Sequence, residues 1–459
     1  GGGGRIAVVY GQNVGFDFEK LSAAGADARD SFGGAGTVFV KGSHQQHGEL
    51  RVDNGGQAPS TTYVADTPVE GGDYDRFEVT GGARVDVSGD LLVEDLVLGS
   101  GDLAVDGSAW IGNSGTLVIA TSSAFSSFSA PNTTSLVVRN ASVFVGGDWG
   151  FPSGIPVTVS DSATLAVSNG WNEIPLSSLS VLSNSVVTSQ PSTSAAARPL
   201  VLTVAGAVLV DSTSRIDVSG KGYLGAWSGD NQSALARTRG NELAPEADAG
   251  GSFGGYGGFA GAKPMDTYGD YAWPVELGSG GTGTASYPGG NGGGLVIVTA
   301  SSLQLDGSIR ANGARGSRRG GSGGAVAIFV DSLAGGGNVE ANGNYDSGGG
   351  RIAVHFGTNS DFNLAGNLLA RGDSYGGAGT VFTKSGDQAY GDLRVDNGGR
   401  NASYVWPTPF LPTGTGELLF DRVSVLRYGR MTTPDNLIVT GAIVVDPNSG
   451  LTAANMTLP

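Results

Sequence analysis

Leu295-Val296-Ile297-Val298 is the first of four short alternating strands that open successive periods of one pattern, which extends from Gly294 to Gly399. A second strand, ending in a turn, closes each period. Each period has a length of about 25 to 30 residues. The opening strands start at Leu295, Ala325, Arg351 and Thr380, and the closing strands start at Ile309, Val339, Leu368 and Leu393.

This periodicity predicts a solenoid. Short strands with period two, separated by glycine and repeated about every 30 residues, are typical of proteins whose rungs stack on one another. A shorter apolar segment such as Leu303–Asp306 lies between the opening and closing strands, so each period is interpreted as one turn with three strands. The predicted fold is therefore all-β, a right-handed parallel β-helix (β-solenoid) with an insertion.

The short periods lie within a second, longer sequence repeat. Gly2–Val8 returns as Gly348–Val354, an offset of 346, and Glu49–Gly56 returns as Asp392–Gly399, an offset of 343. The chain therefore holds more than one copy, roughly one and a third, of a unit of about 345 residues. Because open solenoid ends expose apolar rungs and strand edges, we expect continuation in a longer chain or head-to-tail self-association into a filament. About eleven rungs at ~4.8 Å each give a unit on the order of 50–55 Å long.

Strand spacing and glycine content divide the chain into six predicted segments. They are the end of a first repeat copy (1–65), a β-helix with rungs of about 20 residues (66–200), one further rung (201–221), a Gly/aromatic-rich insertion (222–293), rungs of about 30 residues (294–400) and the start of the next shorter-rung segment (401–459).

A gap in the periodicity locates the insertion. Ile216 and Ile309 begin equivalent closing strands, but the distance between them exceeds one period by about 63 residues. The insertion is rich in aromatic residues, which a disordered linker rarely is, so we expect it to be ordered and to pack against the solenoid wall. The aromatic residues are Tyr223, Trp227, Phe253, Tyr256, Phe259, Tyr268, Tyr271, Trp273 and Tyr287.

Four Asn-Gly pairs occur at the same corner of their rungs. Asn accepts a positive φ at modest cost and Gly at none, so the pair suits a sharp turn, and stacked amides can form a hydrogen-bonded ladder. A row of ligand-binding amides is the functional alternative, and a structural turn ladder is the favoured interpretation. The four asparagines are Asn54, Asn312, Asn342 and Asn397.

Composition excludes several classes of function. The chain has no cysteine, so disulfides and thiolate metal sites are ruled out. A net charge of −16 argues against nucleic acid and against an anionic membrane surface as partners. No run of apolar residues reaches the length that a membrane span needs.

Candidate site residues are few. Calcium stays open as a cofactor because aspartates near the turns offer oxygen ligands, but no calcium-loop motif occurs and solvated carboxylates are favoured. These are Asp53, Asp90, Asp106, Asp211, Asp306 and Asp396. The one basic cluster is interpreted as solvated in preference to paired with a neighbouring chain; it contains Arg310, Arg315, Arg318 and Arg319. No carboxylate pair or Ser/His/Asp group stands out, so no catalytic, metal or cofactor-binding residue is predicted.

The elements Gly348–Val354, Gly377–Phe382 and Leu393–Gly399, with their earlier copies, resemble the glycine-rich β-helix repeats of very large secreted surface proteins. The insertion ending in Leu277-Gly278-Ser279-Gly280-Gly281 looks like one that those repeats often carry. This resemblance covers about 1–65 and 200–400. It implies an extracellular, adhesin-like or fibre-forming role and brings no catalytic residues.

Two classes of function therefore follow. The first is a structural, non-enzymatic extracellular protein that forms or decorates a cell-surface fibre, with an adhesion role and cell-surface glycans as candidate partners. The alternative is a carbohydrate-active β-helix enzyme or a glycan-binding solenoid. A tandem array favours the first, because catalysis needs one optimised cleft and gains nothing from copies.

Overall fold

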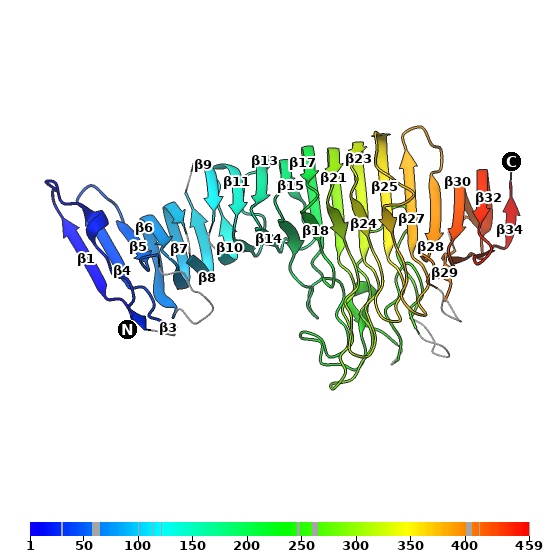
Figure 1. Ribbon diagram of the computed structural model, residues 1–459, viewed down its shortest axis with the longest axis horizontal. Coiled ribbons are helices and arrows are strands. Elements are labelled where there is room, and N and C mark those ends of the chain that lie inside the picture. Colours follow the sequence, from blue (N-terminus) through cyan, green and yellow to red (C-terminus); the bar gives the residue numbers. More distant parts are fainter. Residues whose placement is uncertain are drawn as a thin grey trace. The chain divides into compact units, whose positions relative to one another are not determined.

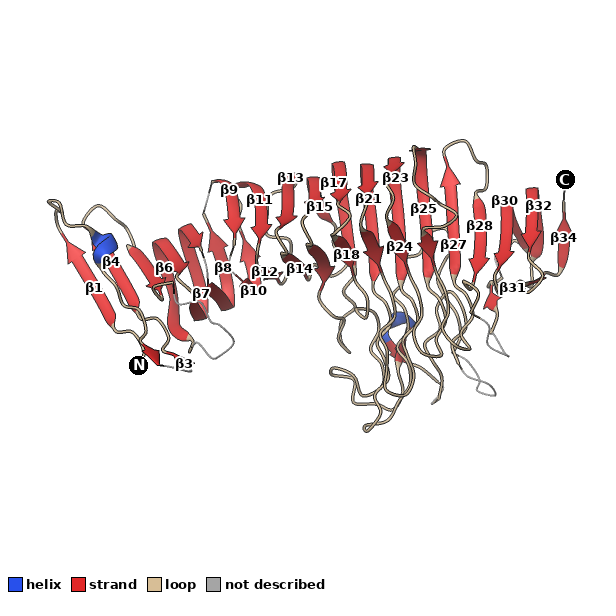
Figure 2. Cartoon of the chain, in the orientation of Figure 1, coloured by secondary structure: helices blue, strands red, loops and turns tan. Residues whose placement is uncertain are grey.

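The computed structural model describes residues 1–28, 31–56, 65–99, 101–112, 114–120, 122–245, 248–258, 265–400, 406–412 and 414–458. These ranges contain β-strands and two short 3-10 turns, η1 (Phe18–Lys20) and η2 (Arg239–Asn241), but no α-helix (Figure 2). Strands make up 48 % of the chain, which confirms the all-β prediction, and their mostly parallel pairing is compatible with a β-solenoid.

The chain divides into two compact units. Unit 1 is Gly1–Asn169 with Leu176–Val187, and unit 2 is Gly170–Pro175 with Thr188–Pro459. The strands β15 (Ile174–Val181) and β16 (Val186–Ser189) lie where the division falls. The other strands of unit 1 are β1 (Arg5–Tyr10), β2 (Asp27–Ala28), β3 (Ser31–Phe32), β4 (Thr37–Gly42), β5 (Glu49–Asp53), β6 (Thr67–Thr80), β7 (Ala83–Leu98), β8 (Gly101–Ile111), β9 (Gly115–Ile119), β10 (Ser122–Ser129), β11 (Thr133–Arg139), β12 (Ser142–Val145), β13 (Ile155–Ser160) and β14 (Thr164–Val167).

Unit 2 contains the longer periods and the insertion (Figure 1). Its strands are β17 (Leu200–Val210), β18 (Arg215–Asp217), β19 (Arg237–Thr238), β20 (Glu242–Leu243), β21 (Leu295–Leu305), β22 (Ser308–Arg310), β23 (Ala325–Ala334), β24 (Asn338–Glu340), β25 (Arg351–Asn359), β26 (Leu368–Leu369), β27 (Thr380–Ser385), β28 (Asp392–Asp396), β29 (Thr408–Pro409), β30 (Glu417–Leu426), β31 (Arg430–Thr432), β32 (Asn436–Val445), β33 (Gly450–Thr452) and β34 (Asn455–Thr457).

The shorter rungs of unit 1 pair in parallel with a nearly constant offset. Ala83 of β7 lies opposite Gly101 of β8, and Ser142 of β12 lies opposite Thr164 of β14. In both pairs the partners are separated by about 20 residues, which is the rung length expected from the sequence of this segment.

In unit 2 the four opening strands stack in parallel with the register that the sequence repeat predicts. Leu295 pairs with Ala325, Ala325 with Arg351, and Arg351 with Thr380. The first three closing strands, β22, β24 and β26, also stack in parallel. β21 to β27 lie side by side in Figure 1, with the glycine-rich loops below them.

The fourth closing strand departs from the prediction. β28 does not continue the stack of β26; it folds back as a hairpin and pairs antiparallel with β27, with Val381 opposite Arg394. Unit 1 has the same hairpin between β4 and β5, with Val38 opposite Arg51. The expectation of parallel pairing throughout is wrong at these two points. In unit 2, Gln388 stands where Leu303 and Leu333 lie in the earlier periods, and its Oε1 accepts from the Ser385 N–H (2.9 Å). Gly391 then adopts a positive φ of 86°, so the chain turns back instead of continuing the rung.

The hairpin in unit 2 moves the apolar core from one face of the sheet to the other. Ala327, Ala353 and Phe382 are aligned across β23, β25 and β27, so they lie on one face. Leu393 of β28 lies directly opposite Phe382, and opposed residues of an antiparallel pair share a face. Leu393 and Phe382 belong to one buried cluster with residues of β30 to β32. The rungs after the hairpin therefore build their core on the face that carries Ala353.

Before the hairpin, the other face is buried as well. Val296, Val326 and Ile352 are aligned in register and fully buried, and they alternate with the residues of the first face. Strands covered on both sides appear in sequence as continuous apolar runs, as in Ala325–Ile328. The face with Ala353, which we call the insertion face, is covered by residues of the insertion, as described next.

The glycine-rich stretches between rungs allow backbone to lie directly on backbone. The Gly349 N–H donates to the Gly377 carbonyl (3.0 Å), and the Arg351 N–H donates to the Gly324 carbonyl (2.9 Å). A Cβ atom on Gly350 would lie 1.9 Å from the Gly324 carbonyl oxygen. Glycine is therefore required here by close approach of the backbones.

Candidate functional site

The insertion packs on the insertion face through its aromatic residues. Tyr223, Phe253 and Tyr268 form a buried cluster with Leu295 of β21 and Ala325 of β23. The Tyr268 hydroxyl lies 2.7 Å from the Leu277 carbonyl, to which it donates. These contacts agree with the expectation that the insertion lies against the solenoid wall.

Arg351 of β25 connects the insertion to the sheet. Its side chain is only 3 % exposed, its Nε donates to the Tyr268 carbonyl (2.9 Å), and a terminal nitrogen donates to Thr380 Oγ1 (3.2 Å). Its guanidinium carbon lies 5.5 Å from the centre of the Phe253 ring. Burial lowers the pKa of Arg351 to about 10. Burying a guanidinium costs free energy unless it has such hydrogen-bond partners. The buried position of Arg351 therefore depends on the backbone of the insertion.

Tyr271 of the insertion lies at the end of the core that follows the hairpin. Its ring centre lies 5.6 Å from that of Phe382, 5.5 Å from Phe410 and 5.3 Å from Phe420. Tyr271 and Ala272 pack against the cluster that contains Leu393. The insertion therefore closes one end of an apolar column that would otherwise open to solvent.

Trp273 continues the cover along the outer part of the same face. Its ring stacks on Phe329 at 4.6 Å and lies 4.8 Å from His355, although 57 % of the residue remains exposed. His355 Nε2 donates to the Ala272 carbonyl (2.8 Å). Burial lowers the pKa of His355 below its ordinary value; the Ala272 carbonyl opposes this shift and Lys384 adds to it.

Acidification is expected to loosen this contact. Since the folded protein holds His355 with a lowered pKa, the unfolded or detached state binds more protons, and stability is lost as the pH falls below about 6.5 toward the lowered value. Hydrogen exchange of residues 270–275 should therefore be faster at pH 5 than at pH 7.5, after correction for intrinsic rates. His355→Gln keeps a donor but cannot titrate, and it should abolish the difference; an unchanged difference in that variant would contradict the assignment.

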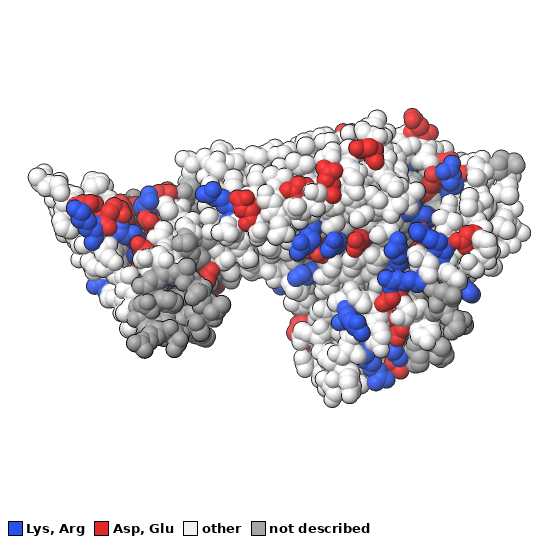
Figure 3. Space-filling model, in the orientation of Figure 1, with Lys and Arg blue, Asp and Glu red and all other residues white. Residues whose placement is uncertain are grey.

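Arginines that were expected to be solvated instead fix the insertion to the loops. Arg318 and Arg319 both contact Asp248 of the insertion, at 3.2 Å, and Arg319 also contacts Asp346 at 2.9 Å. Figure 3 shows basic and acidic side chains together on the loops of unit 2. The interpretation of this cluster as solvated is therefore wrong for these two residues, because the sequence alone does not indicate which loop lies beside them.

The side chains of the predicted asparagines connect neighbouring rungs, but they accept hydrogen bonds from backbone N–H groups and do not form a ladder of side-chain amides. Asn312 Oδ1 accepts from the Asn342 N–H (2.8 Å), and Asn342 Oδ1 accepts from the Arg371 N–H (3.0 Å). Asn54 and Asn397 are fully buried and accept from Gly25 N–H and Gly372 N–H, each at 2.9 Å. None of the four has a positive φ; Gly55 and Gly398 adopt it instead. The turn conformation expected of asparagine thus belongs to the glycine that follows it in these two pairs.

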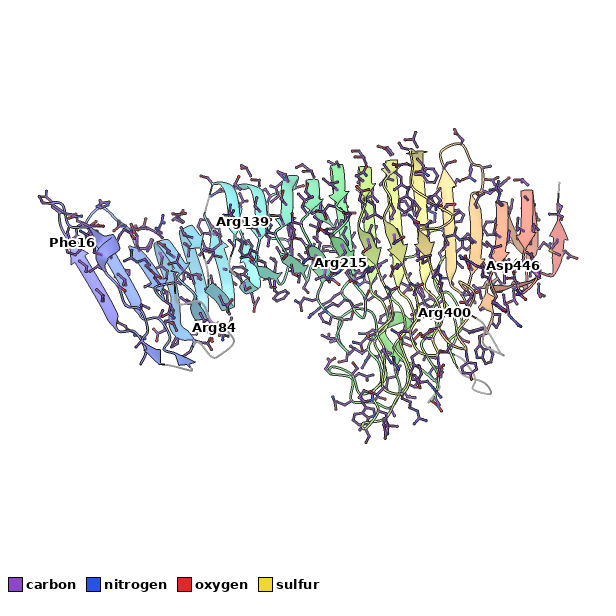
Figure 4. The ribbon with its side chains drawn as sticks, in the orientation of Figure 1. Phe16, Arg84, Arg139, Arg215, Arg400 and Asp446 are labelled. Carbon is purple, nitrogen blue, oxygen red and sulfur yellow. The ribbon has the colours of Figure 1, made fainter. Side chains whose placement is uncertain are left out.

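A groove in unit 1 was not predicted from the sequence. It has a volume of about 520 Å³ and crosses β7, β8, β10, β12 and β14. Arg84, labelled in Figure 4, lies 3.3 Å from Asp66 and 3.4 Å from Asp102, and Asp86 also lines the groove. Burial raises the pKa of Asp102, Arg84 opposes the shift and Asp66 adds to it. The groove thus combines carboxylates, an arginine, serine hydroxyls and the ring of Phe144.

No known protein family, curated protein or solved structure matches the chain. In the ranges that the structure describes, no three His, Asp or Glu residues come together as a group able to hold a metal ion. The described residues also include no helix long and apolar enough to cross a membrane.

Proposed function

We propose that this protein is a structural extracellular repeat protein, a right-handed β-solenoid that forms or decorates a fibre at the cell surface and presents repeated surfaces for adhesion. The observation that supports this proposal is the return of one arrangement in both units. Val38 opposite Arg51 and Val381 opposite Arg394 are equivalent pairs, and both members are displaced by the same offset of the longer repeat. A chain that repeats the same rungs and hairpin at this interval is suited to forming a long structure.

One handedness is compatible with both sides of the hairpin. Strand direction reverses there, which alone would invert the sense of coiling. The core also moves to the other face, which inverts it again, so the two changes cancel. A right-handed coil before the hairpin therefore remains right-handed after it.

Labelling of intact cells tests this proposal. Antibodies raised against the purified chain are expected to mark filaments on unpermeabilised cells of the source organism, with an axial repeat on the order of 50–55 Å or a small multiple of it. Antibodies against a cytoplasmic protein serve as the control for cell integrity. Labelling only after permeabilisation, or compact particles without axial periodicity, would contradict the proposal.

The groove in unit 1 favours a glycan as a second candidate ligand. Carboxylates beside an arginine, hydroxyl groups and a half-buried aromatic ring such as Phe144 are groups suited to recognising a sugar in an open groove. A glycan-binding solenoid, or a carbohydrate-active enzyme on the same scaffold, is therefore the alternative. Binding to a glycan panel that is lost in Arg84→Ala and retained in Arg139→Ala, a change on β11 outside the groove lining, would support it.

A further inference from the structure

Unit 1 contains a second copy of the insertion face, and no described residue covers it as the insertion covers the first. Arg5, Ala7 and Val9 of β1 occupy the positions of Arg351, Ala353 and His355 of β25, each displaced by the offset of the longer repeat. Arg5 and Ala7 are exposed, whereas Arg351 and Ala353 are buried beneath the insertion. Val9 is 75 % exposed, an unusual state for valine in a strand.

A pocket lies at the end of the core on this face, within unit 1. Its volume is about 440 Å³, and it is lined by Arg5, Thr37, Leu50, Val69 and Tyr74, among others. Leu50 lies opposite Phe39 in the β4–β5 hairpin, as Leu393 lies opposite Phe382 in the later one. The pocket therefore lies at the end of the unit 1 core that corresponds to the end closed by Tyr271 in unit 2.

Five residues of this pocket have counterparts near Tyr268 and Tyr271 in unit 2. Thr67 Oγ1 donates to the Ala35 carbonyl as Thr408 Oγ1 donates to the Ala378 carbonyl, which makes Val69 equivalent to Phe410. Tyr74 precedes Asp75-Arg76 as Phe420 precedes Asp421-Arg422. The counterparts of Arg5, Thr37, Leu50, Val69 and Tyr74 are thus Arg351, Thr380, Leu393, Phe410 and Phe420.

We propose that the uncovered face and pocket of unit 1 bind a second copy of the insertion segment Tyr268–Trp273, supplied by another repeat. The occupant is inferred from the equivalent site, where this segment is already seated. Leu50, Val69 and Tyr74 would receive the Tyr271 ring, Arg5 the Tyr268 carbonyl, and Val9 the indole of Trp273. This interaction would join one repeat to another through side chains, and it goes beyond the proposed fibre role without depending on a cell-surface location.

A peptide of residues 265–277, Met-Asp-Thr-Tyr-Gly-Asp-Tyr-Ala-Trp-Pro-Val-Glu-Leu, provides the probe. It is expected to bind the full chain by fluorescence anisotropy, and a peptide with Tyr271→Ser should bind at least about tenfold more weakly, because a buried aromatic anchor dominates such contacts. In the chain, Val9→Glu should lower affinity about tenfold. Val14→Glu makes the same change at a 94 % exposed position outside β1 and should leave affinity unchanged.

Disulfide capture gives a second readout that detects weak binding. The chain has no cysteine, so Val9→Cys and Val14→Cys each introduce a single thiol. Under reversible disulfide exchange, a peptide carrying Trp273→Cys should be captured about tenfold more by the Val9→Cys chain than by the Val14→Cys chain. This preference for the Val9→Cys chain should fall when the peptide also carries Tyr271→Ser. Equal capture by both chains, or anisotropy binding that is insensitive to Tyr271→Ser and Val9→Glu, would overturn the proposal.

Discussion

Gly350→Ala is expected to disrupt the stacking of β25 on its neighbours, with a loss of more than about 4 kcal/mol in the free energy of unfolding of these rungs. The new Cβ atom would lie 1.9 Å from the Gly324 carbonyl oxygen, which is fixed by its hydrogen bond from the Arg351 N–H. Neither backbone can yield without breaking contacts in the next rung. Denaturant unfolding followed by hydrogen exchange of β23 and β25 measures the effect.

Gly336→Ala is the matched control. Gly336 lies in a turn of the same stack, but a Cβ atom there has no neighbour within 4 Å and its φ is not positive. The substitution should change stability by no more than about 1 kcal/mol, in the stabilising direction if anything. Similar losses in both variants would show that glycine flexibility, rather than close approach, is what these positions need.

Phe382→Ala is expected to cost about 3–5 kcal/mol in the rungs around the hairpin of unit 2. The Phe382 ring is buried, and it contacts both Tyr271 of the insertion and His355 of β25. Its removal would leave a cavity between the sheet, the insertion and the following core. Hydrogen exchange across β27, β28 and β30, together with protease sensitivity of the insertion, measures the result.

Phe39→Ala provides the comparison, since Phe39 has the same place in the hairpin of unit 1. It is only partly buried, and no insertion lies above it among the residues that the structure describes. Its replacement should cost less than half as much, because side chains at a partly open site lose fewer contacts. Equal costs would mean that the insertion contributes little to the stability of the hairpin.

Much of the architecture could be predicted because it depends on local periodicity. The spacing of Leu295, Ala325 and Arg351 predicted the register of three rungs, and the structure pairs these residues directly. The hairpin was missed because Leu393–Asp396 alternates like any other strand and carries no mark of its direction. The signal that was present is Gln388 at the place of the apolar Leu303 and Leu333, followed by Gly391 at the turn.

The sites were harder to predict than the fold, because they join residues that only the stacking of rungs brings together. Asp66, Arg84 and Asp102 follow one another at the spacing of a short rung, and they meet only once the rungs of unit 1 are stacked. The ion pairs of Asp248 required knowledge of where the insertion folds back. Aromatic content did predict that the insertion packs on the solenoid, but it could not identify Tyr271 as the residue that closes the core.

The hairpin also has a consequence for symmetry. Reversing strand direction and exchanging the two faces of the sheet, while rungs continue to add along the same axis, together amount to a half-turn about that axis. Within unit 2, the rungs β21 to β27 and the rungs β28 to β32 are therefore related by a half-turn about the rung axis. The outward side of the rungs after the hairpin is therefore the side of the sheet that carries the core before it, so a row of side chains that is hidden on one side of the hairpin faces solvent on the other.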